Sequence, residues 1–155
     1  LYNQGPCKED CISMNYNNVT VRQSGNLWLV VDGNSSLYSA PNSAEANAIV
    51  SIIKHYRLTK SCFVGRPGPS FKYMLAGSAS PSGAKPGEDC IGFNPATLVV
   101  KPDGAQYLLT DGSSRLFVFP NKTEADQALA MIRKYGFTKT CFVGRPDPSL
   151  QYMRK

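Results

Sequence analysis

The sequence predicts an α+β fold built from a tandem duplication of a small β-β-β-α-β-β unit, an antiparallel sheet with one helix, each tied by a disulfide. The chain repeats itself with a shift of 79 residues, and 30 positions between residues 9 and 74 match their partners. Each copy shows short β-prone runs followed by one helical pattern. We therefore divide the 155 residues into an N-terminal extension (1–8), repeat 1 (9–75), a linker (76–87) and repeat 2 (88–155).

Three β-prone runs open each copy. They are 19–22, 27–31 and 37–38 in the first copy, and 98–101, 106–110 and 116–119 in the second. Asp32-Gly33 and Asp111-Gly112 follow the second run, and this dipeptide tolerates the positive φ of a hairpin turn. The runs therefore predict an antiparallel meander. Trp28 is expected in the core, as strand aromatics usually are. Alternation places it opposite the leucines of its strand, so it would be exposed if the helix covered the leucine face.

Helices are expected at about 43–57 and 122–136. Asn42 precedes Glu45, and Asn121 precedes Glu124, at the spacing of an N-cap and its capping partner. Gly136 marks the end of the second helix, whereas Arg57 stands there in the first. The expected buried stripes are Ala46, Ile49, Val50, Ile53 and Tyr56, and Ala125, Ala128, Leu129, Ile132 and Tyr135.

The returning strands follow the helices. A strand is expected at 62–64, a turn at the prolines after Arg66, and a final strand at 70–75, with the same order in the second copy. Residues 76–87 hold Gly, Ser, Pro and Ala with no strong apolar residue, which is typical of a linker.

The cysteines predict two local disulfides. Cys11 and Cys62 are 51 residues apart, as are Cys90 and Cys141, and closing a loop of that length stabilises a small unit by roughly 4 kcal/mol. An interlocked pairing of Cys11 with Cys141 and Cys62 with Cys90 stays open. Cys7 has no counterpart, so we expect a free thiol or a bridge to a second copy of the chain, giving a disulfide-linked homodimer.

Several features favour a secreted glycoprotein. Glycosylation sequons stand at Asn18, Asn34 and Asn121, and the chain begins at Leu1, as a mature protein does after signal removal. No apolar run reaches the length of a membrane span. The net charge of +6 is spread without long basic runs, so we expect neither nucleic acid nor membrane insertion.

Catalytic and metal chemistry are not expected. His55 is the only histidine, its counterpart is Lys134, and no Cys-x-x-Cys pair or second histidine is present for zinc. Glu9-Asp10 and Glu88-Asp89 are the only adjacent acidic pairs. They could bind calcium or the arginine of a partner, but the simpler interpretation is a solvated segment beside a disulfide. We expect no enzyme and no cofactor.

The segment Phe-Val-Gly-Arg-Pro-x-Pro-Ser-x-x-Tyr is the densest block of identity between the copies. As a ligand site it would use Arg66, Ser70 and Tyr73, with Arg145, Ser149 and Tyr152 in the second copy. Arginine offers a planar fork of donors, and tyrosine an aromatic face, for sugar hydroxyls or acidic groups. The structural alternative is an arginine that bonds backbone carbonyls beside a core tyrosine.

Two equivalent sites without catalytic chemistry favour a secreted binding protein of the plant-defence type, most simply a carbohydrate-binding lectin whose partners are glycans or secreted proteins. The alternative is an inhibitor of secreted proteases, although Arg66-Pro67 and Arg145-Pro146 would resist trypsin-like cleavage. A basic antimicrobial protein is the third hypothesis.

Overall fold

The computed structural model describes residues 9–155 and shows an α+β protein whose two halves contain the same elements in the same order. The first half contains β1 (Asp10–Ser13), a 3₁₀ turn (Tyr16–Asn18), β2 (Val19–Ser24), β3 (Leu27–Asp32), β4 (Ser35–Ala40), α1 (Ser43–Tyr56), β5 (Lys60–Val64) and β6 (Phe71–Leu75). The second contains β7 (Asp89–Gly92), a 3₁₀ turn (Pro95–Thr97), β8 (Val99–Asp103), β9 (Gln106–Thr110), β10 (Arg115–Phe119), α2 (Lys122–Tyr135), β11 (Lys139–Val143) and β12 (Leu150–Arg154).

The strands form four antiparallel sheets of three strands each, rather than one sheet per copy. β2-β3-β4 and β8-β9-β10 are the meander sheets. β1-β5-β6 and β7-β11-β12 are the disulfide sheets, named for the cysteines they carry. The prediction of one β-β-β-α-β-β sheet was wrong in this respect. It missed β1 and β7, four-residue strands too short and too polar to show a clear alternation.

Both predicted disulfides are confirmed. Cys11 bonds Cys62 and Cys90 bonds Cys141. In each case the two cysteines lie directly opposite each other on neighbouring antiparallel strands, at a Cα–Cα distance of 4.0 Å. The disulfide therefore holds the short first strand of each half against the strand that leaves the helix. Cys7 lies outside the described residues.

The helices begin and end where the sequence predicts. Asn42 Oδ1 accepts a hydrogen bond from the Glu45 amide at 2.8 Å, and Asn121 Oδ1 accepts one from the Glu124 amide at 2.9 Å. Each helix ends in a left-handed residue, with φ of 54° at Arg57 and 66° at Gly136. Arg57 occupies a conformation that glycine adopts without the steric cost of a Cβ.

The buried helix surface is wider than the predicted stripe. Ile52 and Met131 are buried although they were not part of the predicted stripe, whereas Val50, Leu129 and Tyr135 are only partly buried. The reason is that each helix packs on two sides. The meander sheet of its own half covers one side, and the disulfide sheet of the other half covers the second.

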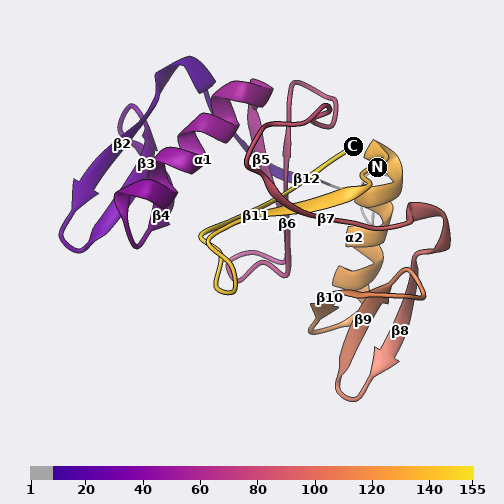
Figure 1. The fold of residues 1–155 in the computed structure, drawn as a ribbon. Coiled ribbons are helices and arrows are strands. Elements are labelled where there is room, and N and C mark those ends of the chain that lie inside the picture. Colours follow the sequence, from indigo (N-terminus) through magenta and orange to yellow (C-terminus); the bar gives the residue numbers. More distant parts are fainter. Residues whose placement is uncertain (1–8) are drawn as a thin grey trace, which may run out of the picture.

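The two halves interlock through their cores. Core 1 contains α1 and the first meander together with Cys141, Val143, Leu150 and Tyr152 of the second half. Core 2 contains α2 and the second meander together with Cys62, Val64, Phe71, Tyr73 and Leu75 of the first half. Figure 1 shows the two disulfide sheets in the middle, where β6 and β12 contact each other, with a helix and a meander sheet on either side.

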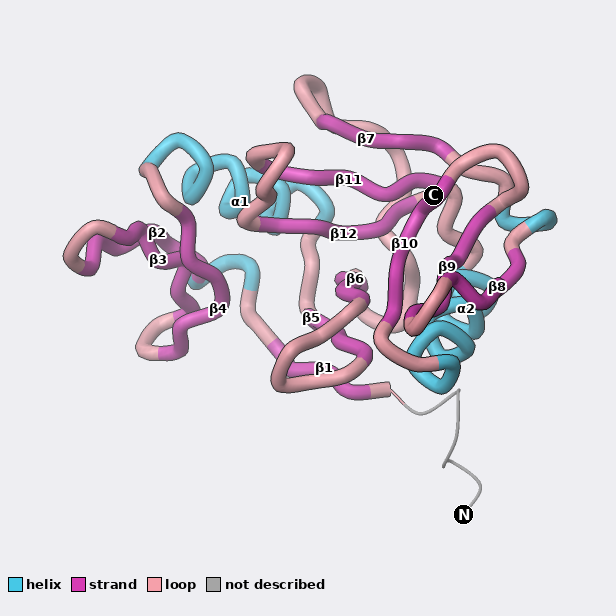
Figure 2. Tube along the Cα trace, turned by 90° about the horizontal axis from the view of Figure 1, so that it is seen from below, coloured by secondary structure: helices cyan, strands magenta, loops and turns pink. Residues whose placement is uncertain are grey.

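Figure 2 shows the same exchange from another side, with β11 and β12 running beside α1 although they belong to the other half of the sequence. The connecting segment is fixed at several points. Ala76 and Ala79 form a β-bridge, and the Lys155 amide donates to the Pro81 carbonyl at 3.0 Å. The division into repeats therefore remains a description of the sequence, because neither core is confined to one half.

Trp28 lies on the core-facing side of β3, as is usual for a strand aromatic, and not on an exposed side. It packs partly buried against core 1 on the side of Val30, which is fully buried, while Leu27 is 48% exposed. The helix therefore covers the tryptophan face of β3 and not the leucine face. The sequence could not decide this, because both faces of β3 carry large apolar residues.

Candidate binding sites at the junctions between the halves

The repeated Gly-Arg-Pro-x-Pro-Ser segments form the loops that join β5 to β6 and β11 to β12. Both Arg-Pro peptide bonds are cis. Each loop closes with a serine amide that donates to the last residue of the preceding strand, Ser70 to the Val64 carbonyl and Ser149 to the Val143 carbonyl, both at 2.9 Å. The two loops therefore present their arginine and serine in matching ways.

Each loop arginine pairs with the aspartate at the start of its own disulfide sheet. Arg66 Nε donates to Asp10 Oδ2 at 2.7 Å, and a second guanidinium nitrogen contacts Oδ1. The guanidinium also lies over the Phe63 ring, 4.7 Å from its centre. The pKa of Arg66 is raised, mainly by its hydrogen bond with Asp10.

The second loop repeats this pair. Arg145 Nε donates to Asp89 Oδ2 at 2.7 Å, and the guanidinium lies 4.7 Å from the centre of the Phe142 ring. The hydrogen bond from Arg145 lowers the pKa of Asp89. Both arginines therefore have a structural role, as one of the two sequence hypotheses expected. They bind an aspartate carboxylate, however, and not backbone carbonyls. The side chains are about 40% exposed, so the outer N–H groups remain accessible.

The loop serines reach across to the helix of the other half. Ser70 Oγ donates to Glu124 Oε1 at 2.5 Å, and Ser149 Oγ donates to Glu45 Oε1 at 2.8 Å. These glutamates are also the capping partners at the N-termini of α2 and α1. The helix start of one half is therefore joined to the turn of the other.

Glycine is required where these loops meet the helices. Gly65 and Gly144 have φ of +83° and +85°, and a Cβ on either would lie within 2.7 Å of the Cδ of Glu124 or Glu45. A side chain there would displace the glutamate. The repeated loop sequence is thus explained to a large extent by this docking between the halves.

Two glutamates hold the tyrosines of both halves. Tyr73 of the first half and Tyr135 of the second both donate to Glu9 Oε2, at 2.8 and 2.6 Å, and Lys134 Nζ donates to Oε1 at 3.0 Å. Burial opposes the ionisation of Glu9, but the hydrogen bonds from Tyr135, Tyr73 and Lys134 outweigh it and lower its pKa.

Glu88 forms the matching cluster in the second half. Tyr152 donates to its Oε2, as does Tyr56 from α1 at 2.6 Å, and the Lys85 amide donates to Oε1 at 2.9 Å. Arg154 Nε lies 3.2 Å from Oε1 as an ion pair, though poorly aligned for a hydrogen bond. Burial opposes ionisation here too, but hydrogen bonds from Tyr152 and Tyr56 bring the net pKa of Glu88 below its ordinary value.

A hollow lies beside each of these clusters, between the disulfide sheet of one half and the helix of the other. Hollow A has a volume of about 230 Å³ and hollow B about 150 Å³. Hollow A is lined by Ala48, Ile52, Lys85, Gly87, Glu88, Asp89, Phe142, Val143, Gly144 and Tyr152. Hollow B is lined by Glu9, Asp10, Phe63, Val64, Gly65, Tyr73, Gln127 and Met131. Within residues 9–155, every residue that lines hollow B stands 79 positions from a residue of hollow A.

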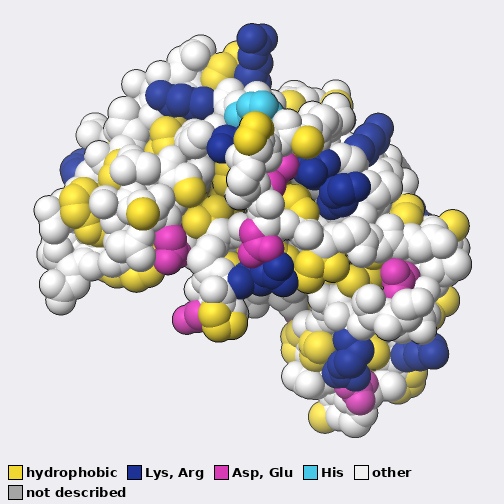
Figure 3. Space-filling view, viewed as in Figure 1, with side chains coloured by type: hydrophobic (Ala, Val, Ile, Leu, Met, Phe, Trp, Pro, Cys, Tyr) yellow, Lys and Arg dark blue, Asp and Glu magenta, His cyan; other side chains and the backbone are white. Residues whose placement is uncertain are grey.

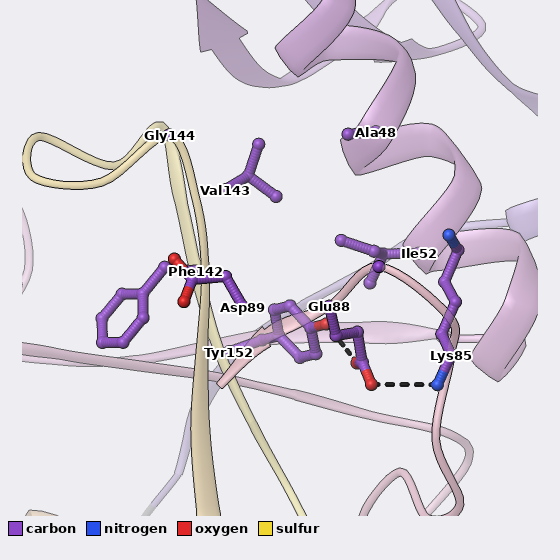
Figure 4. Close-up of a pocket in the computed structure, with 10 residues that line it drawn as sticks. Ala48, Ile52, Lys85, Glu88, Asp89, Phe142, Val143, Gly144 and Tyr152 are labelled. Atoms are coloured by element: carbon purple, nitrogen blue, oxygen red, sulfur yellow. Dashed lines mark hydrogen bonds between the residues drawn. The ribbon is translucent and has the colours of Figure 1, made fainter. Parts of the chain in front are cut away.

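Figure 4 shows how the wall of hollow A is divided. Ala48 and Ile52 project from α1 toward Val143 and the ring of Tyr152, which gives an apolar side. Glu88 lies beside the Tyr152 ring, Asp89 lies beside Phe142, and the Lys85 side chain stands at the edge. An apolar wall with a few placed polar groups is the usual composition of a small-molecule site.

The sequence-predicted site residues are placed differently from one another. Arg66 and Arg145 are partly exposed in the loops after β5 and β11. Ser70 and Ser149 donate hydrogen bonds to glutamates at the start of the helix of the other half. Tyr73 and Tyr152 line the hollows but are each only 1% exposed, so their ring faces pack inside the protein. Whether these six residues bind a ligand stays a prediction.

The other residues that line the two hollows were not predicted to form a site. Asp10, Asp89, Phe63 and Phe142 were in view as repeated residues, and the adjacent acidic pairs were the signal that could have found them. The helical wall could not be found in that way. It comes from the other half, more than 30 residues away along the chain, and only the packing of the halves brings it there.

Two groups of metal-ligand type occur among residues 9–155, but both contain a disulfide. They consist of Glu9 with Cys11 and Cys62, and of Glu88 with Cys90 and Cys141. A disulfide sulfur is not a thiolate, which is the form that binds a metal. His55 is exposed in the last turn of α1, with its ring 4.6 Å from that of Tyr56.

The sequon asparagines Asn18, Asn34 and Asn121 are all exposed. Asn18 Nδ2 donates to Asp32 Oδ1 at 3.0 Å, Asn121 caps α2, and Asn34 lies in the turn between β3 and β4. Lys and Arg side chains form separate groups on the face in Figure 3, several of them beside acidic side chains.

No family model matches the chain, and the comparisons with curated proteins and with solved structures found no match either. Neither helix of residues 9–155 is long and apolar enough to cross a membrane.

Proposed function

We propose that the chain is a secreted carbohydrate-binding protein of the defence type, a lectin with two pseudo-equivalent sites, and that the sites are hollows A and B. The observation that carries the proposal is that equivalent positions of the two halves line a hollow twice, each time at a junction between the halves. On this proposal the repeat is a tandem duplication, and the exchange of helices between the halves places one site at each junction.

The chemistry of the hollows supports a sugar as the ligand. Each pairs a mostly apolar wall with a carboxylate that is more than 40% exposed, Asp89 in hollow A and Asp10 in hollow B. Carboxylate oxygens accept hydrogen bonds from hydroxyl groups, and charge-assisted bonds of this kind are the stronger ones. The outer N–H groups of Arg145 and Arg66 add donors at the edge.

The size of the hollows points in the same direction. Both are smaller than the roughly 300–1,000 Å³ typical of sites for drug-sized molecules, so each suits about one sugar ring. One ring gives weak binding, and two sites on one chain raise the apparent affinity for a surface that repeats the sugar. A bridge between two chains through Cys7 would raise it again. The two disulfides are compatible with an extracellular location.

The experiment is a glycan array followed by red-cell agglutination, with inhibition by simple sugars. The proposal expects binding that a monosaccharide inhibits. Arg66→Ala and Arg145→Ala should each leave weaker, monovalent binding, and the double variant should abolish agglutination. Because both arginine pairs are exposed, the melting temperature should change little in all three.

Arg115→Ala is the matched control, since Arg115 forms an exposed ion pair with Asp103 on the second meander sheet, outside both hollows. It should bind like the parent protein. Absence of glycan binding at high protein concentration would contradict the proposal. A parallel titration against trypsin, subtilisin and papain tests the inhibitor hypothesis, and stoichiometric inhibition there would replace it.

A further inference from the structure

The helical walls of the two hollows differ in chemistry. Ala48 and Ile52 of α1 face hollow A, and their counterparts facing hollow B are Gln127 and Met131 of α2. The other described residues of hollow B are identical to their counterparts, namely Glu9, Asp10, Phe63, Val64, Gly65 and Tyr73. The difference between the hollows is therefore confined to two residues on the helix wall, as far as residues 9–155 show. The counterparts of Lys85 and Gly87 lie at positions 6 and 8, outside the described residues.

We infer that the two sites are unequal, that hollow A is the stronger one, and that residues 48 and 127 determine the difference. The inference rests on the proposed function. At position 48 a methyl group leaves the space beside Val143 and Ile52 open, as Figure 4 shows. At position 127 a longer amide side chain stands in the same place and hollow B is smaller, about 150 against 230 Å³. The Gln127 amide also weakens binding of a sugar ring against this wall. The ring would cover the amide, which would then lose its hydrogen bonds with water.

The ligand of hollow A is an uncharged sugar. Asp89 is neutralised by Arg145 and Glu88 by Arg154, so neither carboxylate leaves an unbalanced charge, and the exposed Asp89 keeps lone pairs for hydroxyl groups. An acidic ligand would approach two neighbouring carboxylates. Only the Lys85 ammonium would attract it, since no carboxylate within residues 9–155 forms an ion pair with that side chain.

The test is calorimetric titration of the full chain with methyl glucoside, methyl galactoside, methyl mannoside and N-acetylglucosamine. Glucuronic acid and glucose 6-sulfate serve as charged counterparts. The parent protein should bind one of the uncharged sugars at a single tighter site and a second, weaker site. Ala48→Gln gives hollow A the side chain of hollow B, and should weaken the tighter site by about tenfold. Gln127→Ala makes the reverse change and should strengthen the weaker site, so that two comparable sites are measured.

Ser51→Gln is the control, because residue 51 is an exposed position of α1 that does not line hollow A. It should titrate like the parent protein, and all variants should melt as the parent does. Two equal sites in the parent, or an Ala48→Gln variant that binds unchanged, would overturn the inference and leave the proposed function standing. A charged sugar that binds more tightly, with loss on Lys85→Gln, would overturn the ligand class. No binding of any sugar would contradict the proposed function, and this inference with it.

Discussion

Gly144→Ala should destabilise the protein far more than an ordinary glycine substitution in a turn. Gly144 has φ of +85°, where a Cβ costs about 1–2 kcal/mol. The added methyl group would also meet Glu45 Oε1 and lie 2.7 Å from its Cδ. Glu45 would have to move, which removes its hydrogen bond from Ser149 Oγ. A bond to a charged group stabilises by roughly 1.5–3 kcal/mol, and a half-exposed one by the lower part of that range.

The expected loss in the free energy of unfolding is therefore about 2–4 kcal/mol. For a chain of this size that lowers Tm by roughly 5–15 °C. Equilibrium unfolding in urea measures the change, provided that the slope of free energy against denaturant stays constant. Gly25→Ala is the matched control, because Gly25 has φ of +62° with nothing within 4 Å of the added Cβ. It should show only the backbone cost of about 1–2 kcal/mol.

A double-mutant cycle separates the two contributions. In a Glu45→Ala background the contact is gone, so the further cost of Gly144→Ala should fall to that of the Gly25→Ala control. The same cost in both backgrounds would refute the reasoning. It would mean that the loop does not dock on the start of α1 and that the halves are not joined there.

Three further predictions follow from other contacts. Arg57→Gly should stabilise the protein by about 1 kcal/mol in urea unfolding, because Arg57 ends α1 at φ 54°; a destabilisation would mean that the arginine side chain makes a contact worth more than the strain. Glu9 has a pKa below its ordinary value of 4.5 in the folded protein, so its contribution to stability is complete above about pH 4.5 and is lost as the pH falls through the folded pKa. Tm measured from pH 7 to pH 3 should therefore fall less steeply in Glu9→Gln than in the parent below pH 4.5, and an unchanged slope would contradict the assignment. Ile132→Ala should cost roughly 2–5 kcal/mol, since Ile132 is fully buried in core 2, and a change below about 0.5 kcal/mol would mean that this side of α2 faces solvent.

Local features of this chain were predictable from the sequence. The helix ends at Asn42, Asn121 and Gly136 follow from capping preferences, and the meanders follow from alternation and turn dipeptides. The disulfides followed from a spacing that occurs twice. Each of these signals lies within one copy of the repeat.

The exchange between the halves was not predictable, because it involves residues far apart in sequence. Ile52 faces Val143 and Tyr152 across the junction, and no periodicity within α1 shows that a second sheet covers it. The Ser70–Glu124 bond joins residues 54 apart, and the Ser149–Glu45 bond joins residues 104 apart. The sequence offered one signal of this exchange. Ile52 beside Ile53 makes the apolar surface of α1 wider than packing on a single sheet requires.

The most direct measurement is a crystal structure of the full chain soaked with the uncharged methyl glycoside that binds best. We expect a sugar ring in hollow A, with its apolar face on Ala48 and Ile52 and its hydroxyl groups on Asp89. Hollow B should fill only at higher concentration. A sugar bound elsewhere, such as on the outer face of the second meander where Val99 and Val118 are about 40% exposed, with both hollows empty, would contradict it.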